Sequence, residues 1–175
     1  MIVGIFGSWR PGPDDEIYKD AYNRAWLIGH MGHRVLTGGY SGVMEAASRG
    51  AYESGGHTIG VTCPEISLLI NPNDWITETI ECESIEKRLA CCIGMIDAAV
   101  FFPGRSGTIS ELALACELRE KKKLAYPVVI YGSFWESFFD WRTQIMDDLP
   151  FSKSPEGKIY ERLDTLEQLQ NFLKT

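Results

Sequence analysis

Short apolar, β-branched runs alternate with segments of helical periodicity along the chain, and this alternation constrains the fold more than any other feature. We expect strands over six runs, at residues 2–6, 33–37, 57–62, 76–81, 97–102 and 127–131. Strands separated by helices of about 10–15 residues are typical of repeated βαβ units, whose right-handed crossovers place helices on both faces of a sheet. The sequence therefore predicts an α/β fold with a doubly wound parallel sheet.

The intervening segments predict six helices. They run from Asp14 to about Met31, over 43–54, from Ser84 to about Ile96, from the 103–107 loop to about Lys123, and over 133–146 and 164–173. We expect Asp14 to cap the first helix, and Asp164 with Glu167 to form a capping box on the last. Residues 63–75 hold two prolines and two asparagines, so they predict a long loop.

The composition of the chain limits its size class and its partners. At 175 residues, with no linker or low-complexity segment, residues 1–175 fit one domain. Seventeen basic against 24 acidic residues give a net charge of −7, which argues against sequence-independent binding to nucleic acid or to an anionic membrane. No run approaches the roughly 18 apolar residues of a membrane span, and the start, MIVGIFG, lacks the features of a signal peptide.

Cysteine and histidine usage bears on redox state and metal binding. The five cysteines are odd in number and lack CxxC spacing, so reduced thiols and a cytoplasmic location are expected rather than a disulfide framework. The three histidines form no HExxH motif and have no cysteine partner at zinc spacing. We therefore expect no metal site.

Three glycine-rich loops follow predicted strands: GSWRPG (7–12), TGGYSG (37–42) and PGRSGT (103–108). The carboxyl ends of parallel strands are where such sheets bind ligands, and helix N-termini attract anions. None of the loops is a Walker A or GxGxxG motif, and each alone has a structural interpretation as a turn. Together they predict a site for a phosphate-bearing ligand such as a mononucleotide. The candidate binding residues are Gly7, Ser8, Arg10, Gly38, Gly39, Gly42, Gly104, Arg105, Ser106, Gly107 and Thr108.

Two further residues have a structural and a chemical interpretation. Glu111 completes Thr108-x-x-Glu111, the spacing of a capping box, but a carboxylate at a phosphate cradle can also orient water or stabilise an oxocarbenium-like sugar. Arg88 is either a surface arginine paired with a nearby glutamate (81, 83 or 86) or a cation of the site. The sequence pattern leaves both pairs of alternatives open.

The chain resembles the Lonely-guy family of nucleoside-monophosphate phosphoribohydrolases, long labelled lysine decarboxylase-like, across residues 2–122. The resemblance lies in VGIFGS, in TGGYSGVMEAASRGAYESGGHTIGV and in RLACCIGMIDAAVFFPGRSGTISE. The family hallmark is P-G-G-x-G-T-x-x-E with an Arg-Lys pair upstream. Arg88 and Pro103 are fifteen residues apart, as in that hallmark.

This resemblance implies a Rossmann-like fold, a homodimer and no metal or organic cofactor. It also implies hydrolysis of the N-glycosidic bond of a 5′-monophosphate, releasing adenine or an N6-substituted adenine and ribose 5-phosphate. Glu111 matches the catalytic carboxylate of the family and Arg88 the arginine that works with it.

Three departures from the hallmark favour an alternative. Arg105 replaces the second glycine of P-G-G, Leu89 replaces the lysine, and Glu45 stands where the cytokinin-activating enzymes have glycine. The segment TGGYSGVMEA resembles the branch of molybdenum-cofactor carrier proteins, which bind a phosphorylated pterin without hydrolysing a nucleotide. We favour the hydrolase and retain the carrier as the alternative.

Overall fold

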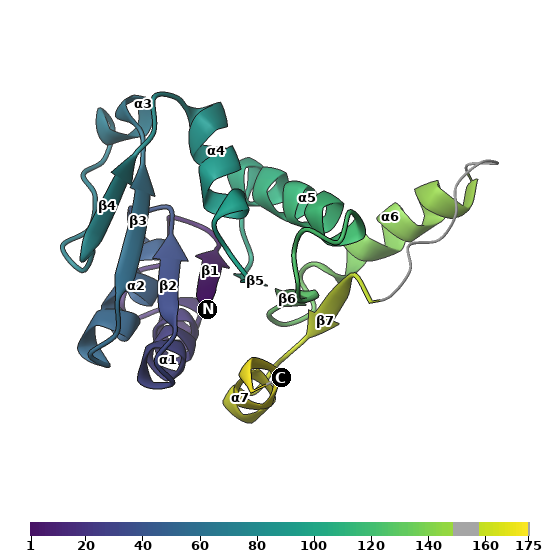
Figure 1. The fold of residues 1–175 in the computed structure, drawn as a ribbon, viewed down its shortest axis with the longest axis horizontal. Coiled ribbons are helices and arrows are strands. Elements are labelled where there is room, and N and C mark those ends of the chain that lie inside the picture. The colour runs from purple at the N-terminus through teal and green to yellow at the C-terminus, as the bar shows by residue number, and fades with distance from the viewer. Residues whose placement is uncertain (149–157, 175) are drawn as a thin grey trace.

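The computed structural model describes residues 1–148 and 158–174, and it shows one twisted sheet with helices on both faces (Figure 1). Within these residues seven strands pair in parallel in the order β4-β3-β2-β1-β5-β6-β7. The strands are β1 Ile2–Phe6, β2 Arg34–Thr37, β3 Thr58–Thr62, β4 Glu78–Glu81, β5 Ala98–Phe101, β6 Val128–Ile130 and β7 Tyr160–Arg162. The predicted α/β fold with a doubly wound parallel sheet is confirmed.

All the described helices except α3 fall into two layers. The helices are α1 Glu16–His30, α2 Val43–Glu53, α3 Pro64–Ser67, α4 Ile85–Gly94, α5 Ser106–Glu120, α6 Glu136–Asp148 and α7 Leu166–Leu173. One buried apolar cluster joins α1, α2 and α7 to the sheet, and a second joins α4, α5 and the start of α6 to the opposite face. Strands buried on both faces explain the continuous apolar runs in the sequence.

The six predicted strands are present, and the seventh, β7, was not predicted. Its residues Tyr160–Arg162 include two charged side chains and no apolar run. This edge strand forms through backbone pairing with β6, in the register Val128↔Tyr160 to Ile130↔Arg162. Since β7 has one neighbour and only three residues, its formation depends on the sheet rather than on a local pattern.

Two cap predictions are each wrong by one residue. Helix α1 begins after Asp15 rather than Asp14, and Asp15 accepts the N–H of Gly12 instead of capping the helix. Helix α7 does begin with a capping box, but its members are Thr165 and Gln168. Within the predicted loop 63–75, residues Pro64–Ser67 form the short helix α3, which proline at its first position favours.

The strand order reverses direction at β1, which lies between β2 and β5. Backbone hydrogen bonds of Ser8 tie the loops after these strands together, because Ser8 N–H donates to Pro103 C=O (3.0 Å) and Ser8 C=O accepts from Val43 N–H (2.9 Å). Ligands of open α/β sheets bind at such a switch point. The three glycine loops therefore meet where the fold favours a ligand.

Candidate functional site

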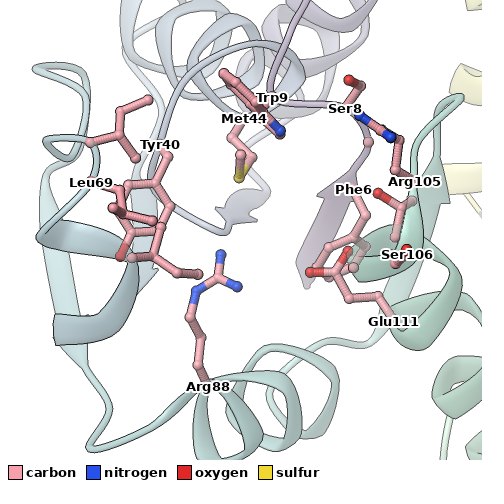
Figure 2. Close-up of a pocket in the computed structure, with 15 residues that line it drawn as sticks. Phe6, Ser8, Trp9, Tyr40, Met44, Leu69, Arg88, Arg105, Ser106 and Glu111 are labelled. Carbon is pink, nitrogen blue, oxygen red and sulfur yellow. The ribbon is translucent and has the colours of Figure 1, made fainter.

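A cavity of about 600 Å³ opens at the carboxyl edge of the sheet, next to this switch point (Figure 2). Its walls come from the loops after β1 and β2, from α2, from the segment after β3, and from α4 and α5. The predicted site residues that line it are Gly7, Ser8, Arg88, Arg105, Ser106, Gly107, Thr108 and Glu111. The fold thus brings together residues that are up to about a hundred positions apart in sequence.

Arg88 enters the cavity from α4 and is only 8% exposed. Its Nε donates to the carbonyl of Val61 (2.7 Å) and its Nη2 to the carbonyl of Gly38 (2.8 Å). The guanidinium also lies over the ring of Tyr40, with 5.4 Å between Cζ and the ring centroid. One backbone acceptor in β3 and one in the loop after β2 therefore fix this cation in place, while its Nη1 makes no hydrogen bond to the described residues.

The glutamates near the start of α4 do not pair with Arg88, so the surface-arginine interpretation is wrong. Glu83 forms an ion pair with Lys87 at i, i+4 spacing on the exposed side of the helix. Arg88 lies one position further round the helix and points towards the sheet edge instead, where it is buried.

Gly38 is needed where the guanidinium approaches the backbone. A Cβ at this position would lie 1.9 Å from Arg88 Nη2 and 2.7 Å from Met44 Sδ, so both side-chain ends would have to move.

We expect Gly38→Ala to leave the protein folded but to displace Arg88. If the cavity carries out the hydrolysis that the sequence resemblance implies, kcat/KM for that reaction should fall about 10²-fold, because misplacement of a group at a reacting centre is costly. Gly94→Ala is the matched control. Gly94 lies on the same helix as Arg88, and a Cβ at this position would meet no atom within 4 Å. This variant should keep full turnover and gain a little stability, about 0.5–1 kcal/mol. Steady-state kinetics and thermal unfolding of both variants test this, and parent-like turnover of Gly38→Ala would contradict the role of the contact.

Glu111 lies in α5, is 9% exposed, and presents its carboxyl to the cavity (Figure 2). The capping-box interpretation is wrong, because α5 begins at Ser106 after Arg105 and places Thr108 inside the first turn. Burial raises the pKa of the Glu111 carboxyl to about 7, and the positive charge of Arg88 partly offsets this increase. No described side chain donates a hydrogen bond to it. A buried, unpartnered carboxyl that titrates near neutrality is suited to proton transfer.

The N-terminus of α5 provides hydrogen-bond donors beside Glu111. Arg105 occupies the N-cap position without a side-chain cap, so the N–H groups of Ser106, Gly107 and Thr108 have no intrahelical acceptor. These donors and the positive end of the helix dipole suit an anion such as phosphate.

Two predicted residues lie outside the cavity, in a neighbouring open hollow of about 680 Å³. Arg10 and Gly104 line this hollow, which shares Ser8 and Arg105 with the cavity. Arg105 therefore stands between the two spaces.

The predicted residues Gly39 and Gly42 support the site without lining the cavity. Gly39 C=O accepts from Asn73 N–H (2.9 Å), which fastens the segment after β3. Gly42 has φ +70°, and a Cβ there would lie 2.4 Å from Ser8 O, so only glycine allows this start of α2. Together with Gly38, they shape the backbone around the cavity.

The cavity also has an apolar wall, whose residues were not among the predicted site residues. This wall consists of Phe6, Trp9, Tyr40, Met44, Ile66, Leu69 and Ile70. Leu69 is 86% exposed and Trp9 56% exposed, which is unusual for large apolar side chains. The apolar run Ile66–Ile70 within a proline-flanked segment was the available signal, and it only becomes meaningful once α3 folds over the cavity.

Trp75 does not border the cavity, although its segment does so through Ile66, Leu69 and Ile70. Its ring packs against Tyr52 and under the guanidinium of Arg49, on the side of the sheet covered by α2.

Two of the three departures from the family hallmark have structural explanations. Leu89 packs, partly buried, against the apolar cluster under α4 and α5 rather than into the cavity. Glu45 accepts a hydrogen bond from the hydroxyl of Tyr18 (3.1 Å), which joins α2 to α1. Only Arg105 changes the cavity itself.

Among the described residues, no group of three or more His, Cys, Asp or Glu side chains is placed to hold a metal ion. Nor does that part of the chain contain a helix with the length and apolar character needed to cross a bilayer. All five cysteines are free thiols.

Comparison with known proteins agrees with this geometry. A sequence model of the SLOG cluster4 family matches residues 1–146. The chain belongs to the SLOG cluster4 family. An uncharacterized protein of Archaeoglobus fulgidus is 35% identical over 135 residues, which span 75% of this chain and 85% of that protein.

This SLOG cluster4 protein is also similar to solved structures over nearly its whole length. A molybdenum cofactor binding protein from Rippkaea orientalis is 25% identical, with a TM-score of 0.76 and coverage of 99% of this chain and 94% of the other. The molybdenum cofactor carrier protein of Chlamydomonas reinhardtii is 25% identical, with a TM-score of 0.73 and coverage of 99% and 95%. The expected placement near the carrier branch is thereby confirmed.

Proposed function

We propose that this protein binds a nucleoside 5′-monophosphate in the cavity and hydrolyses its N-glycosidic bond to a free base and ribose 5-phosphate. The observation that carries the proposal is the carboxyl of the buried Glu111, which faces the cavity across from the guanidinium of Arg88. Burial raises the pKa of this carboxyl to about 7, which suits a group that takes a proton from water and releases it again at neutral pH.

Each part of the cavity has a chemical role in this reaction. The free N–H groups at the start of α5, with Ser8 and Arg105, bind the phosphate. Glu111 accepts a proton from a water molecule. The oxygen of that water attacks C1′ of the ribose, and the bond between C1′ and the base nitrogen breaks. The carboxylate stabilises the positive charge that develops on the sugar, and the proton that Glu111 took from water passes to the departing base, so that Glu111 is again ionised at the end of the cycle.

A second candidate function is supported by the similar solved structures, two of which bind or carry molybdenum cofactor. On this alternative the same phosphate cradle holds a phosphorylated pterin, and the apolar wall covers its ring system. Arg105, which is absent from the hydrolase hallmark, would then add a phosphate contact without serving catalysis.

Other properties follow as proposals from the sequence and the surface. We expect a cytoplasmic homodimer with no nucleic-acid or membrane partner and no bound metal or organic cofactor. Phe134, Trp141 and Ile145 are 55%, 58% and 42% exposed on and before α6, an apolar surface that a second subunit would cover.

The experiment that tests the proposal incubates the purified protein with AMP and with an N6-substituted AMP, and follows free base by chromatography. Release by the parent protein that is lost in Glu111→Gln supports the hydrolase, with Glu111 as the catalytic carboxylate. No release, together with tight binding of a phosphorylated pterin, overturns the hydrolase in favour of the carrier.

A further inference from the structure

Tyr40, in the loop after β2, is 2% exposed and makes contacts that the hydrolysis itself does not require. Its hydroxyl accepts from the N–H of Cys63 (3.0 Å), donates to the carbonyl of the same residue (3.1 Å) and lies 3.1 Å from Ser67 Oγ. A tyrosine hydroxyl offers one donor and two acceptor sites, so these contacts use its full capacity. The hydroxyl thus ties the end of β3 to α3.

The backbone of Tyr40 holds the other end of the same segment. Its carbonyl accepts from Asn73 Nδ2 (2.9 Å), while the neighbouring Gly39 accepts from Asn73 N–H. Residues 63–73 are therefore attached at both ends to one loop. Between these attachments lie Ile66, Leu69 and Ile70, which form part of the apolar wall.

The ring of Tyr40 acts on a different part of the site. It faces the guanidinium of Arg88, which two carbonyl groups hold from the side. A desolvated cation over an aromatic face is attracted by the ring quadrupole. In Figure 2 the ring of Tyr40 lies between Leu69 and Arg88, at the border of the apolar and the charged parts of the cavity.

We propose that Tyr40 is a positioning residue with two separable roles. Its hydroxyl fixes the position of the apolar wall that contacts the ring system of the ligand, and its aromatic face fixes the position of the Arg88 guanidinium. The tests that measure kcat, KM and pH dependence rest on the proposed hydrolysis, whereas the tests that measure ligand affinity do not. Arg88 and Glu111 remain the groups that meet the reacting atoms.

The first test separates the hydroxyl from the ring. Tyr40→Phe should weaken AMP binding about three- to tenfold, as expected for lost buried hydrogen bonds, and leave the affinity for ribose 5-phosphate unchanged. The KM for AMP should rise by a similar factor while kcat falls less than about twofold, because the ring over Arg88 is retained. Tyr22→Phe is the matched control, since its hydroxyl bonds Glu53 on the outer helices (2.6 Å), away from the cavity.

The second test removes the ring. Tyr40→Leu should lower kcat about tenfold or more, because Arg88 loses one face of its support. The charge of Arg88 lowers the pKa of Glu111. If the guanidinium moves away from its position, this pKa should rise, and the acid limb of the plot of kcat against pH should move to higher pH. Cys92 on α4 also faces this carboxyl, but burial raises its pKa and keeps the thiol neutral across that range. Loss of stability alone would reduce the amount of active protein without moving the limb.

Several outcomes overturn the proposal. One is an equal effect of Tyr40→Phe and Tyr40→Leu on kcat, and another is an unmoved acid limb in Tyr40→Leu.

If the parent protein hydrolyses nothing, the proposed function fails while the binding test still stands. Tyr40→Phe must then weaken the binding of AMP and leave the binding of ribose 5-phosphate unchanged, and an equal effect on both ligands refutes the inference. If Tyr40→Leu does not fold, Tyr40→Met, which also removes the ring, replaces it, and it must lower kcat and move the acid limb in the same direction.

Discussion

Replacing Arg88 by alanine is expected to reduce base release from AMP about 10³-fold, as removal of a preorganised charge from an active site does. The guanidinium acts on Glu111 across the cavity, so its loss removes the positive charge that lowers the pKa of this carboxyl. The carbonyl groups of Gly38 and Val61 also lose their donor in a buried place. We expect the free energy of unfolding to fall by about 2–3 kcal/mol as a result.

Arg119→Ala provides the control that separates these two effects. Arg119 likewise donates to backbone carbonyls, those of Leu124, Ala125 and Lys158, but it lies far along α5 from the cavity. This variant should lose some stability and keep parent turnover per folded molecule. Steady-state kinetics normalised to the folded fraction distinguish the two, and equal losses of turnover in both variants would contradict a catalytic role for Arg88.

The fold was largely predictable because a parallel sheet buried on both faces produces apolar runs that stand out locally. Features that depend on pairing between distant segments were not predictable. Strand β7 exists through its ladder with β6, and the start of α5 is fixed by the loop that Pro103 and Ser8 join rather than by the side chain of Thr108. A capping-box spacing at 108–111 therefore gave the wrong helix boundary.

Only the glycine-rich and charged part of the site was predictable from the sequence. Glycine loops and a carboxylate at fixed spacing are visible in sequence, because each predicted loop is a run of contiguous residues. The apolar wall is different: Tyr40, Met44 and Ile66 come from three segments that meet only when α2 and α3 are folded. Glu45 and Leu89 show the converse, since a departure from a family motif can serve helix packing and say nothing about the ligand.

Glu111→Gln is expected to change the pH dependence of stability as well as to abolish turnover. The folded-state pKa of Glu111 is raised to about 7 from an ordinary value of 4.5, so the folded protein binds this proton more tightly than the unfolded chain does. The stabilising contribution is complete below pH 4.5 and is lost as pH rises through about 7. With about 1.4 kcal/mol per pKa unit, the parent should lose about 3 kcal/mol from this one group between pH 4.5 and 8.

Denaturant unfolding of the parent and of Glu111→Gln at several pH values from 5 to 8 measures this contribution. All other titrating groups are shared, so the difference in unfolding free energy isolates Glu111, and it should move in favour of the glutamine variant as pH rises. Glu117→Gln, on the exposed side of the same helix in an ion pair with Lys121 (3.6 Å), should show no such change in favour of the variant. If the parent and Glu111→Gln keep a constant difference across this range, the carboxyl is ionised in both states and is not held near neutrality. A gain in stability at pH 8 together with a loss of base release would show that the fold tolerates an unfavourable buried charge at this position, which is expected where function requires it.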